Sequence, residues 1–391
     1  MKERLLCWFA FFIPLEQILY YTIGIDTELK PYRVFLLLIF FIIIVQKKKS
    51  NYKLFFEFNA LSLVFLYGLV LGLIRIGLGY GEFTYLINGA SHYIIGLITF
   101  YIFSNIWNRK LYSKIGKFFI VGLLITSIYG AYIYFFNSSS YFRLRGFFNN
   151  PNHLAIVINL ITPLLIYNYI KGIDRIKNFF LILFFSIIVF FTGSRTGVLL
   201  QSVSILYLIA FQKNIISNLL IYAVGGILTF LFVVDPLLSK NDNFLDRYDE
   251  SNYATAGGRF DIINSVKNLA IDNYFSGVGI QQYRFYHRKY AKFSEIEALL
   301  EFDLGTHNHY LDLFVNFGLL SFIIYIFILF RIGKSINKIK LKEDRKVIQL
   351  FFLIFLIACA SQEMFMWPIF WICLSFLVAL KKIYRYETFR S

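Results

Sequence analysis

Residues 241–250 read NDNFLDRYDE, near the start of a polar stretch that runs from Asp235 to Thr306. On both sides of this stretch the chain is a succession of apolar runs that are long enough to cross a bilayer. So long a polar segment cannot lie in the hydrocarbon layer, and it must emerge on one face of the membrane. The sequence therefore predicts a membrane protein with one large water-facing loop, and any chemistry is expected in that loop.

The composition supports this class of protein. Hydrophobic residues make up 58% of the chain and charged residues only 16%, and the mean hydropathy is +0.63. This leaves too few polar side chains to cover a soluble globule. The net charge of +16 does not indicate nucleic-acid binding, because Lys and Arg occur in short clusters between apolar runs, where membrane topology explains them. Cys7, Cys359 and Cys373 lie in apolar runs without ligand spacing, so neither disulfides nor zinc is predicted.

The apolar runs predict an all-α polytopic membrane protein with about twelve transmembrane helices. The predicted spans are Leu5–Tyr21, Tyr32–Val45, Ala60–Gly79, Tyr85–Phe103, Phe118–Phe136, His153–Ile170, Phe179–Phe191, Gly197–Phe211, Ile216–Val234, Tyr310–Phe330, Val347–Ala360 and Met364–Leu380. No small-x-small cleavage site follows the first run, so it is expected to be retained. The prediction is one membrane domain over residues 1–391, in which the large loop, residues 235–306, separates the ninth and tenth spans.

Basic residues alternate along this series of spans. The Lys and Arg clusters lie at residues 47–53, 109–117, 171–177, 213, 331–346 and 381–385. All of them fall on one side of the membrane in this series, and the positive-inside rule makes that side the cytoplasm. Both termini are therefore expected to be cytoplasmic and the large loop extracytoplasmic.

The first outward motif is RLRGFFNNPNHLA at residues 143–155. Pro151 suits the first turn of a helix, and the neighbouring Asn residues, including Asn152, can cap that helix. In this interpretation the motif is a turn, a cap and two basic residues at the edge of a loop. The alternative is functional, with Arg143 and Arg145 beside a helix N-terminus and facing one anionic ligand.

The second motif is TGSRTG at residues 192–197, a turn barely long enough to leave the membrane. An arginine in such a place must snorkel or be paired, and an intramembrane charge is by default a functional hypothesis. Arg195 is therefore either a headgroup anchor for its helix or a residue that binds a ligand.

The third motif is GGRFD at residues 257–261, followed by an amphipathic run that ends near the Gly277-Val278-Gly279 sequence. The pattern predicts a short helix on the membrane surface with Arg259 at its start. A cation at a helix N-terminus opposes the helix dipole, which favours an anionic ligand over a purely structural role. The GxG sequence alone is weak support for a phosphate loop.

The fourth motif is HNHY at residues 307–310, where apolar sequence resumes. A single His at a helix start is commonly a cap. The group His307, Asn308 and His309, facing the loop that carries Arg259, instead favours catalysis or ligand contact. A metal site would need further ligands, and the nearby acids are close only in sequence, so no metal or other cofactor is predicted.

These motifs, in this order, resemble the signatures of the bacterial O-antigen polymerase and O-antigen ligase superfamily. The matching elements are GFFNNPNHLA at 146–155, SRT at 194–196, GR at 258–259, GVG at 277–279 and HN at 307–308. Each is short, but their order and spacing together are specific, and they cover most of the chain from Arg143 to Phe330. The closing family pattern matches at His307, Asn308 and Gly318 and departs at Ser321, where one small residue replaces another.

The resemblance implies a membrane-embedded glycosyltransferase with an external catalytic loop. It assigns Arg195 and Arg259 to the diphosphate of a lipid-linked donor, and His307 to activation of the acceptor hydroxyl. The chemistry agrees, since Arg stabilises a departing diphosphate with two hydrogen bonds and a near-neutral imidazole can accept a proton. Further substrate contacts are expected from Arg143, Arg145, Asn152, Asn308 and His309.

The implied location is a bacterial inner membrane, and the implied partners are an undecaprenyl-diphosphate-linked glycan, an acceptor glycan or lipid A core, membrane lipids and a chain-length regulator. A polymerase of O-antigen or capsule repeat units is favoured over a ligase, because Asn-Pro-Asn at 150–152 and HNHY resemble the polymerase and capsule branches. A transporter or lipid-linked sugar flippase would also explain many spans and buried cations. It would predict internal repeats between the two halves, and none is visible in the sequence.

Overall fold

The computed structural model describes residues 2–19, 30–45, 55–136, 143–210, 259–290 and 305–385. Within these residues the secondary structure is helical, and none of them forms a strand. The predicted span Ile216–Val234 lies outside the described residues, as do residues 235–258 and 291–304 of the predicted loop.

A helix lies at every other predicted span. The helices are α1 (Lys2–Phe12), α3 (Pro31–Val45), α4 (Phe56–Gly77), α5 (Phe83–Ile106), α6 (Arg109–Phe136), α7 (Pro151–Ile170), α8 (Arg175–Phe191), α9 (Arg195–Ala210), α14 (Arg259–Asp272), α15 (Tyr283–Tyr290), α16 (His309–Ile336), α17 (Lys342–Ser361) and α18 (Pro368–Arg385). Among the described helices, α4, α5, α6, α7 and α16 are long and apolar enough to cross a membrane. The all-helical prediction is thereby confirmed for the described residues, and the long apolar helices are consistent with a membrane protein, whereas the number of spans and the side of the large loop stay predictions.

The first predicted span is wrong in its length. One helix was expected over Leu5–Tyr21, but α1 ends at Phe12 and residues 13–17 form turns. Pro14 explains this end, because it has no N–H for the helix and its ring disfavours helical backbone in the residue before it. A helix of 11 residues is roughly 16 Å long, about half the thickness of the hydrocarbon layer.

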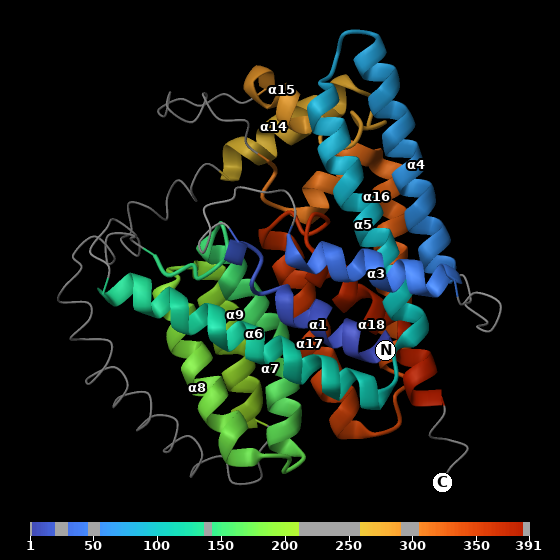
Figure 1. Cartoon of the computed structure of the whole chain (residues 1–391). Coiled ribbons are helices and arrows are strands. Elements are labelled where there is room, and N and C mark those ends of the chain that lie inside the picture. The colour runs from blue at the N-terminus through green and yellow to red at the C-terminus, as the bar shows by residue number, and fades with distance from the viewer. Residues whose placement is uncertain are drawn as a thin grey trace.

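Two groups of helices are joined through α17 (Figure 1). In one group α4 packs against α5 and α16, and in the other α7 packs against α8 and α9. α17 contacts α7, α9 and α16, while α18 contacts α5 and α16. α14 and α15 lie together at one end of the bundle, at the top of Figure 1, where α14 contacts α16.

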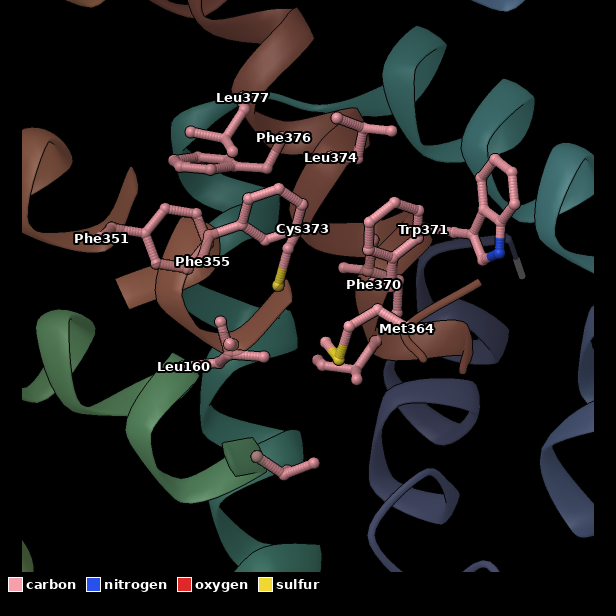
Figure 2. Packing of buried hydrophobic residues seen from close by; sticks show 14 of the residues in the cluster. Leu160, Phe351, Phe355, Met364, Phe370, Trp371, Cys373, Leu374, Phe376 and Leu377 are labelled. Atoms are coloured by element: carbon pink, nitrogen blue, oxygen red, sulfur yellow. The ribbon is translucent and has the colours of Figure 1, made fainter. Parts of the chain in front are cut away.

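Aromatic side chains fill the core where α17 meets α18 (Figure 2). The rings of Phe355 and Phe370 stack with their centroids 5.4 Å apart, and Phe351 meets Phe376 edge-on at 5.7 Å. Trp371 is buried and lies 5.3 Å from Phe370, centroid to centroid. Aromatic pairs in these geometries contribute about 0.5–1.5 kcal/mol each beyond their burial. These ring contacts pack α17 against α18 and so fix the position of the turn that connects them.

A line of polar side chains joins α7, α8 and α9 inside the apolar bundle. Asn159 donates to a backbone carbonyl of α9 at 3.0 Å, Thr162 donates to Gln201 at 3.3 Å, and Gln201 donates to Ser186 at 2.8 Å. Hydrogen bonds between helices in a membrane typically contribute on the order of 1 kcal/mol. These bonds fix the register of α9 against α7, and with it the position of Arg195 at the start of α9.

Ion pairs mark the end of the bundle opposite α14 and α15. Glu57, in the first turn of α4, pairs with Arg331 of α16 at 3.2 Å. Lys171 pairs with Glu343 at 2.6 Å and with Asp344 at 3.3 Å. The hydrogen bond between Lys171 and Glu343 raises the pKa of Lys171 and lowers the pKa of Glu343. These pairs tie α4 to α16 and α7 to α17, far from the sequence motifs.

α14, α15 and the connection between them form an outer layer at one end of the bundle. α16 is interrupted at Gly318, and residues 275–279 of this connection fill the interruption. Gly318 has φ +80°, outside the helical region. The N–H groups of residues 278 and 279 donate to the carbonyls of residues 315 and 316, at 3.0 and 2.8 Å. In the reverse direction, the N–H of residue 319 donates to the carbonyl of residue 275 at 2.9 Å. The backbone groups that α16 leaves unpaired are satisfied by protein, as non-helical backbone within a membrane protein requires.

The Gly277-Val278-Gly279 sequence serves this close approach. Gly277 has φ +89°, and a Cβ placed on it would lie 2.6 Å from the backbone nitrogen of Gly318. On the other side, the hydroxyl of Tyr67 in α4 donates to the carbonyl of residue 276 at 2.7 Å. Two N–H groups of the sequence are bonded to α16, so these groups do not cradle a phosphate.

Candidate active site

The sequence motifs gather at the end of the bundle where α14 and α15 lie. α7, α9, α16 and α18 all begin there, and the partial positive charge of helix N-termini favours anions. The described residues bring mainly basic and imidazole side chains to this end: Arg143, Arg145, His153, Arg195, Arg284 and His307, with the carboxylate of Glu363 among them. This end of the molecule therefore suits an anionic ligand.

His307 lies in the turn that precedes α16, and its side chain is exposed. Its φ is +48°, a left-handed conformation that costs a non-glycine residue about 1–2 kcal/mol and persists only where the surroundings enforce it. Asn308 helps to hold the backbone of His307 in this conformation. Its side chain caps α16 by accepting from the N–H groups of residues 310 and 311 at 2.9 and 3.1 Å, and it donates to the carbonyl of Ala360 at 2.9 Å. Asn308 thus anchors the turn that presents His307.

Glu363, in the turn between α17 and α18, holds the same turn from another side. Its Oε1 accepts from the backbone N–H of His307 at 3.1 Å and from the hydroxyl of Thr306 at 3.3 Å. Its Oε2 pairs with Arg284 of α15 at 3.3 Å, and the Glu363 side chain is only 11% exposed. A Cβ placed on Gly305 would overlap this carboxylate. One carboxylate thereby joins α15, the His307 turn and the connection between α17 and α18.

His309 lies two residues after His307 but in the opposite environment. Its side chain is 0% exposed, and its ring lies 4.0 and 4.7 Å from the rings of Phe365 and Phe370, centroid to centroid. Within the described part of the chain neither of its ring nitrogens has a hydrogen-bond partner. His309 therefore packs inside the bundle, and the structure gives no support to the predicted substrate contact of this side chain.

Arg143 connects two of the outward motifs. Its Nε donates to the carbonyl of Thr192, and its Nη2 donates to Oδ1 of Asn152, both at 2.6 Å. Asn152 occupies the first turn of α7, after Pro151, and its N–H donates to the capping side chain of Asn150 at 2.9 Å. The predicted turn and helix cap are confirmed. Arg143 also holds the TGSRTG turn against the start of α7.

Arg145 and Arg143 line a small cavity beside α6. Its volume is about 20 Å³, and Tyr129 and Tyr134 are among the other residues that line it. A space of this size holds about one water molecule. Because a diphosphate is far larger, any contact of these two arginines with a lipid-linked donor has to be made outside this cavity.

Arg195 is the first residue of α9 and is half-buried. The turn before it is fixed by its neighbours: the hydroxyl of Ser194 accepts from the N–H of Gly197 at 3.2 Å, and the N–H of Leu144 donates to Phe191 at 3.0 Å. Together with the bond from Arg143, these contacts set the direction in which α9 begins. The arginine is presented by a rigid turn.

α14 begins at Arg259, as the sequence predicts. The side chain of Arg259 lies outside the described residues. The helix itself packs on α16 through an apolar cluster that includes Ile262, Val266, Leu269 and Val315. The start of α14 therefore belongs to the same end of the molecule as the start of α16.

A ring contact links the arginine motifs to the histidine motif. His153, next to Asn152, lies against Trp367 with the ring centroids 3.8 Å apart, and Trp367 belongs to the same turn as Glu363. A continuous series of contacts therefore runs from the turn before Arg195, through Arg143 and the start of α7, to the His307 turn.

Sequence reasoning missed Arg284, Glu363 and Trp367. The signal for Glu363 was a single acid in SQEMFMW, residues 361–367, between two apolar runs on the predicted outer side. Such a connection has the composition of an ordinary short loop, and its contacts become visible only in the fold. In the described ranges, no group of three or more His, Cys, Asp or Glu side chains could hold a metal ion.

Residues 179–326 of the chain match the family model described as O-Antigen ligase. No curated protein matches the chain. The matched segment starts in α8 and ends in α16, so it contains Arg195, Arg259 and His307 and leaves out Arg143 and Glu363. The match over this segment supports the resemblance of the chain to the O-antigen polymerase and ligase superfamily.

Proposed function

We propose that the chain is a membrane glycosyltransferase that moves an undecaprenyl-diphosphate-linked glycan onto a hydroxyl of an acceptor sugar. One observation carries the proposal: the family-matched segment includes an exposed imidazole, His307, at the end of the bundle where the arginine motifs lie. The basic side chains and helix N-termini at this end support an anionic donor. The enzyme lies in a bacterial inner membrane, with both termini in the cytoplasm and this end on the extracytoplasmic face.

Arg195 and Arg259 bind the diphosphate of the donor. Guanidinium groups can each offer two hydrogen bonds to phosphate oxygens, and they keep their charge at every physiological pH. Their contribution grows as charge builds up on the departing diphosphate, so they stabilise the transition state more than the bound donor. Arg143 and Arg145 recruit the anionic donor without taking part in the chemistry, and Asn152 positions Arg143 through their hydrogen bond.

His307 acts as the general base. The acceptor oxygen attacks the anomeric carbon of the donor glycan while its proton passes to the imidazole. The bond from the anomeric carbon to the diphosphate oxygen breaks, and the diphosphate leaves on its lipid with the bonding electron pair. A single displacement of this kind inverts the anomeric centre. It requires a neutral His307, so the rate falls as pH drops through the pKa of this group.

The favoured acceptor is a second lipid-linked repeat unit, which makes the enzyme a polymerase of O-antigen or capsule repeats. Lipid A core is the alternative acceptor, and the description of the matched family as O-Antigen ligase favours it. Both reactions use the same donor and the same three residues. They differ only in the sugar that presents its hydroxyl to His307.

The test is reconstitution of the purified protein with lipid-linked repeat units, with and without lipid A core. A polymerase extends the repeat units in both mixtures, whereas a ligase forms product only when the core is present. Arg195→Ala, Arg259→Ala and His307→Ala should each reduce transfer by about a hundredfold or more, since one oriented donor at a diphosphate contributes on the order of 3 kcal/mol. Arg→Lys should recover little activity, because a point charge does not reproduce the planar fork. A His307→Ala protein that transfers glycan at near-normal rate would contradict the mechanism.

A further inference from the structure

We propose that Glu363 is the positioning residue of the His307 base, and that it also ties α15 to that base through Arg284. The inference rests on the proposed function, because it assigns a role toward His307. The inference adds two residues to the site. Glu363 lies outside the matched segment 179–326, and Arg284 lies within it but belongs to none of the sequence motifs.

The backbone at His307 needs an external support. Its φ of +48° is unfavourable for a residue with a Cβ, and its side chain is exposed and not held by burial. The N–H of His307 is bonded to Oε1 of Glu363 at 3.1 Å, and the same oxygen accepts from Thr306 at 3.3 Å. The carboxylate thus holds two successive residues of the turn at once. Hydrogen bonds to a charged acceptor are stronger than those between neutral groups.

Arg284 holds the carboxylate in place. The ion pair joins Nη2 of Arg284 to Oε2 of Glu363 at 3.3 Å. Oε2 therefore binds Arg284, while Oε1 binds the His307 turn. The turn that carries Glu363 is itself fixed by the Trp367–His153 contact at 3.8 Å and by the bond from Asn308 to residue 360 at 2.9 Å. Among the described residues, the charged and titratable groups in this series of contacts are Glu363 from the α17–α18 turn, Arg284 from α15 and His153 from α7.

Two variants of Glu363 separate the possible effects. Glu363→Gln keeps an oxygen that can accept from the His307 N–H but loses the charge, and Glu363→Ala loses both. We expect transfer per folded molecule to fall about tenfold for Gln and about a hundredfold for Ala, as displacement of a catalytic group by ~1 Å can produce. The acid limb of the pH–rate profile of Glu363→Gln should also shift to lower pH, because the lost negative charge no longer favours the imidazolium form.

The matched control is Glu57→Gln at the opposite end of the bundle. The Glu57–Arg331 pair has an N–O distance of 3.2 Å and a carboxylate 12% exposed, against 3.3 Å and 11% for Arg284–Glu363. If loss of a half-buried ion pair acts only through stability, both Gln variants should lower the melting temperature alike and leave the pH profile unchanged. Transfer by Glu57→Gln should stay within about twofold of the unmodified enzyme, the range expected when no reacting group is displaced.

The outcomes are distinguishable from failure of the proposed function. An inactive His307→Ala together with a fully active Glu363→Ala would overturn only this inference. A pH profile of Glu363→Gln that coincides with that of the unmodified enzyme would also overturn it. An active His307→Ala would overturn the proposed mechanism itself, whatever the Glu363 variants do.

Discussion

Replacement of Gly318 by alanine is expected to loosen the outer layer from α16. Gly318 combines two restraints. Its φ is +80°, and a Cβ on it would overlap the carbonyl oxygen of Ser276, which belongs to the segment that fills the interruption of α16. An alanine there must either push this segment away or restore the regular helix, and both responses break the hydrogen bonds between residues 275–279 and α16.

The expected cost follows from these two restraints. The left-handed conformation costs an alanine about 1–2 kcal/mol, and overpacking of a tight site typically costs about 1–3 kcal/mol. A total near 3 kcal/mol would raise the population of the detached state about 150-fold at room temperature, since each 1.4 kcal/mol is about a factor of ten. Gly79 provides the control for strain alone, because its φ is +79° and no described atom lies within 4 Å of a Cβ placed on it.

Hydrogen–deuterium exchange measures this opening directly. In Gly318→Ala, the N–H groups of Val278 and Gly279 should exchange on the order of a hundred times faster, because exchange of a bonded amide reports the free energy of the opening that exposes it. In Gly79→Ala these two groups should exchange at the unmodified rate. Equal protection of Val278 and Gly279 in Gly318→Ala and in the unmodified protein would refute the reasoning.

Further predictions concern the outward arginines, the cap of α16 and the topology. Arg145→Gln should raise the donor concentration needed for half-maximal transfer, with most of the rate recovered at saturating donor; Arg143→Gln should in addition lower the melting temperature, because it loses its bonds to Thr192 and Asn152. Asn308→Ala should destabilise the protein by about 1 kcal/mol through the lost cap of α16, as thermal unfolding with an Asn308→Ser comparison would show. Cysteines introduced at positions 246 and 340 should react with an impermeant reagent from opposite sides of the membrane, and reaction from one side would contradict the topology.

The helices could be predicted from the sequence because a bilayer demands long apolar runs, and such runs are visible without any knowledge of packing. The prediction failed at Pro14, where the apolar run continues but the backbone cannot remain helical. Hydrophobicity alone therefore located the helices, and the local chemistry of proline set one end that hydrophobicity missed.

The candidate site was predicted less completely. His307 and His309 have the same residue type and nearly the same position in the sequence, yet one is exposed and the other is 0% exposed. The difference comes from the direction in which α16 begins, which depends on the cap at Asn308 and on a turn more than fifty residues away. Gly318 could be recognised as part of a family pattern, but the reason for a glycine there is the approach of residues 275–279. Contacts between distant segments decide all of these points.

The interruption of α16 also constrains the order in which the protein is made. Residues 275–279 leave the ribosome before residues 315–319. Until α16 has been made, their N–H and carbonyl groups can therefore form these hydrogen bonds only with water. α16 faces the converse difficulty, since in lipid its open carbonyls would have no partner without that segment. The interrupted form of α16 therefore depends on the docking of residues 275–279, and the outer layer reaches its final structure only after the helix that follows it has been made.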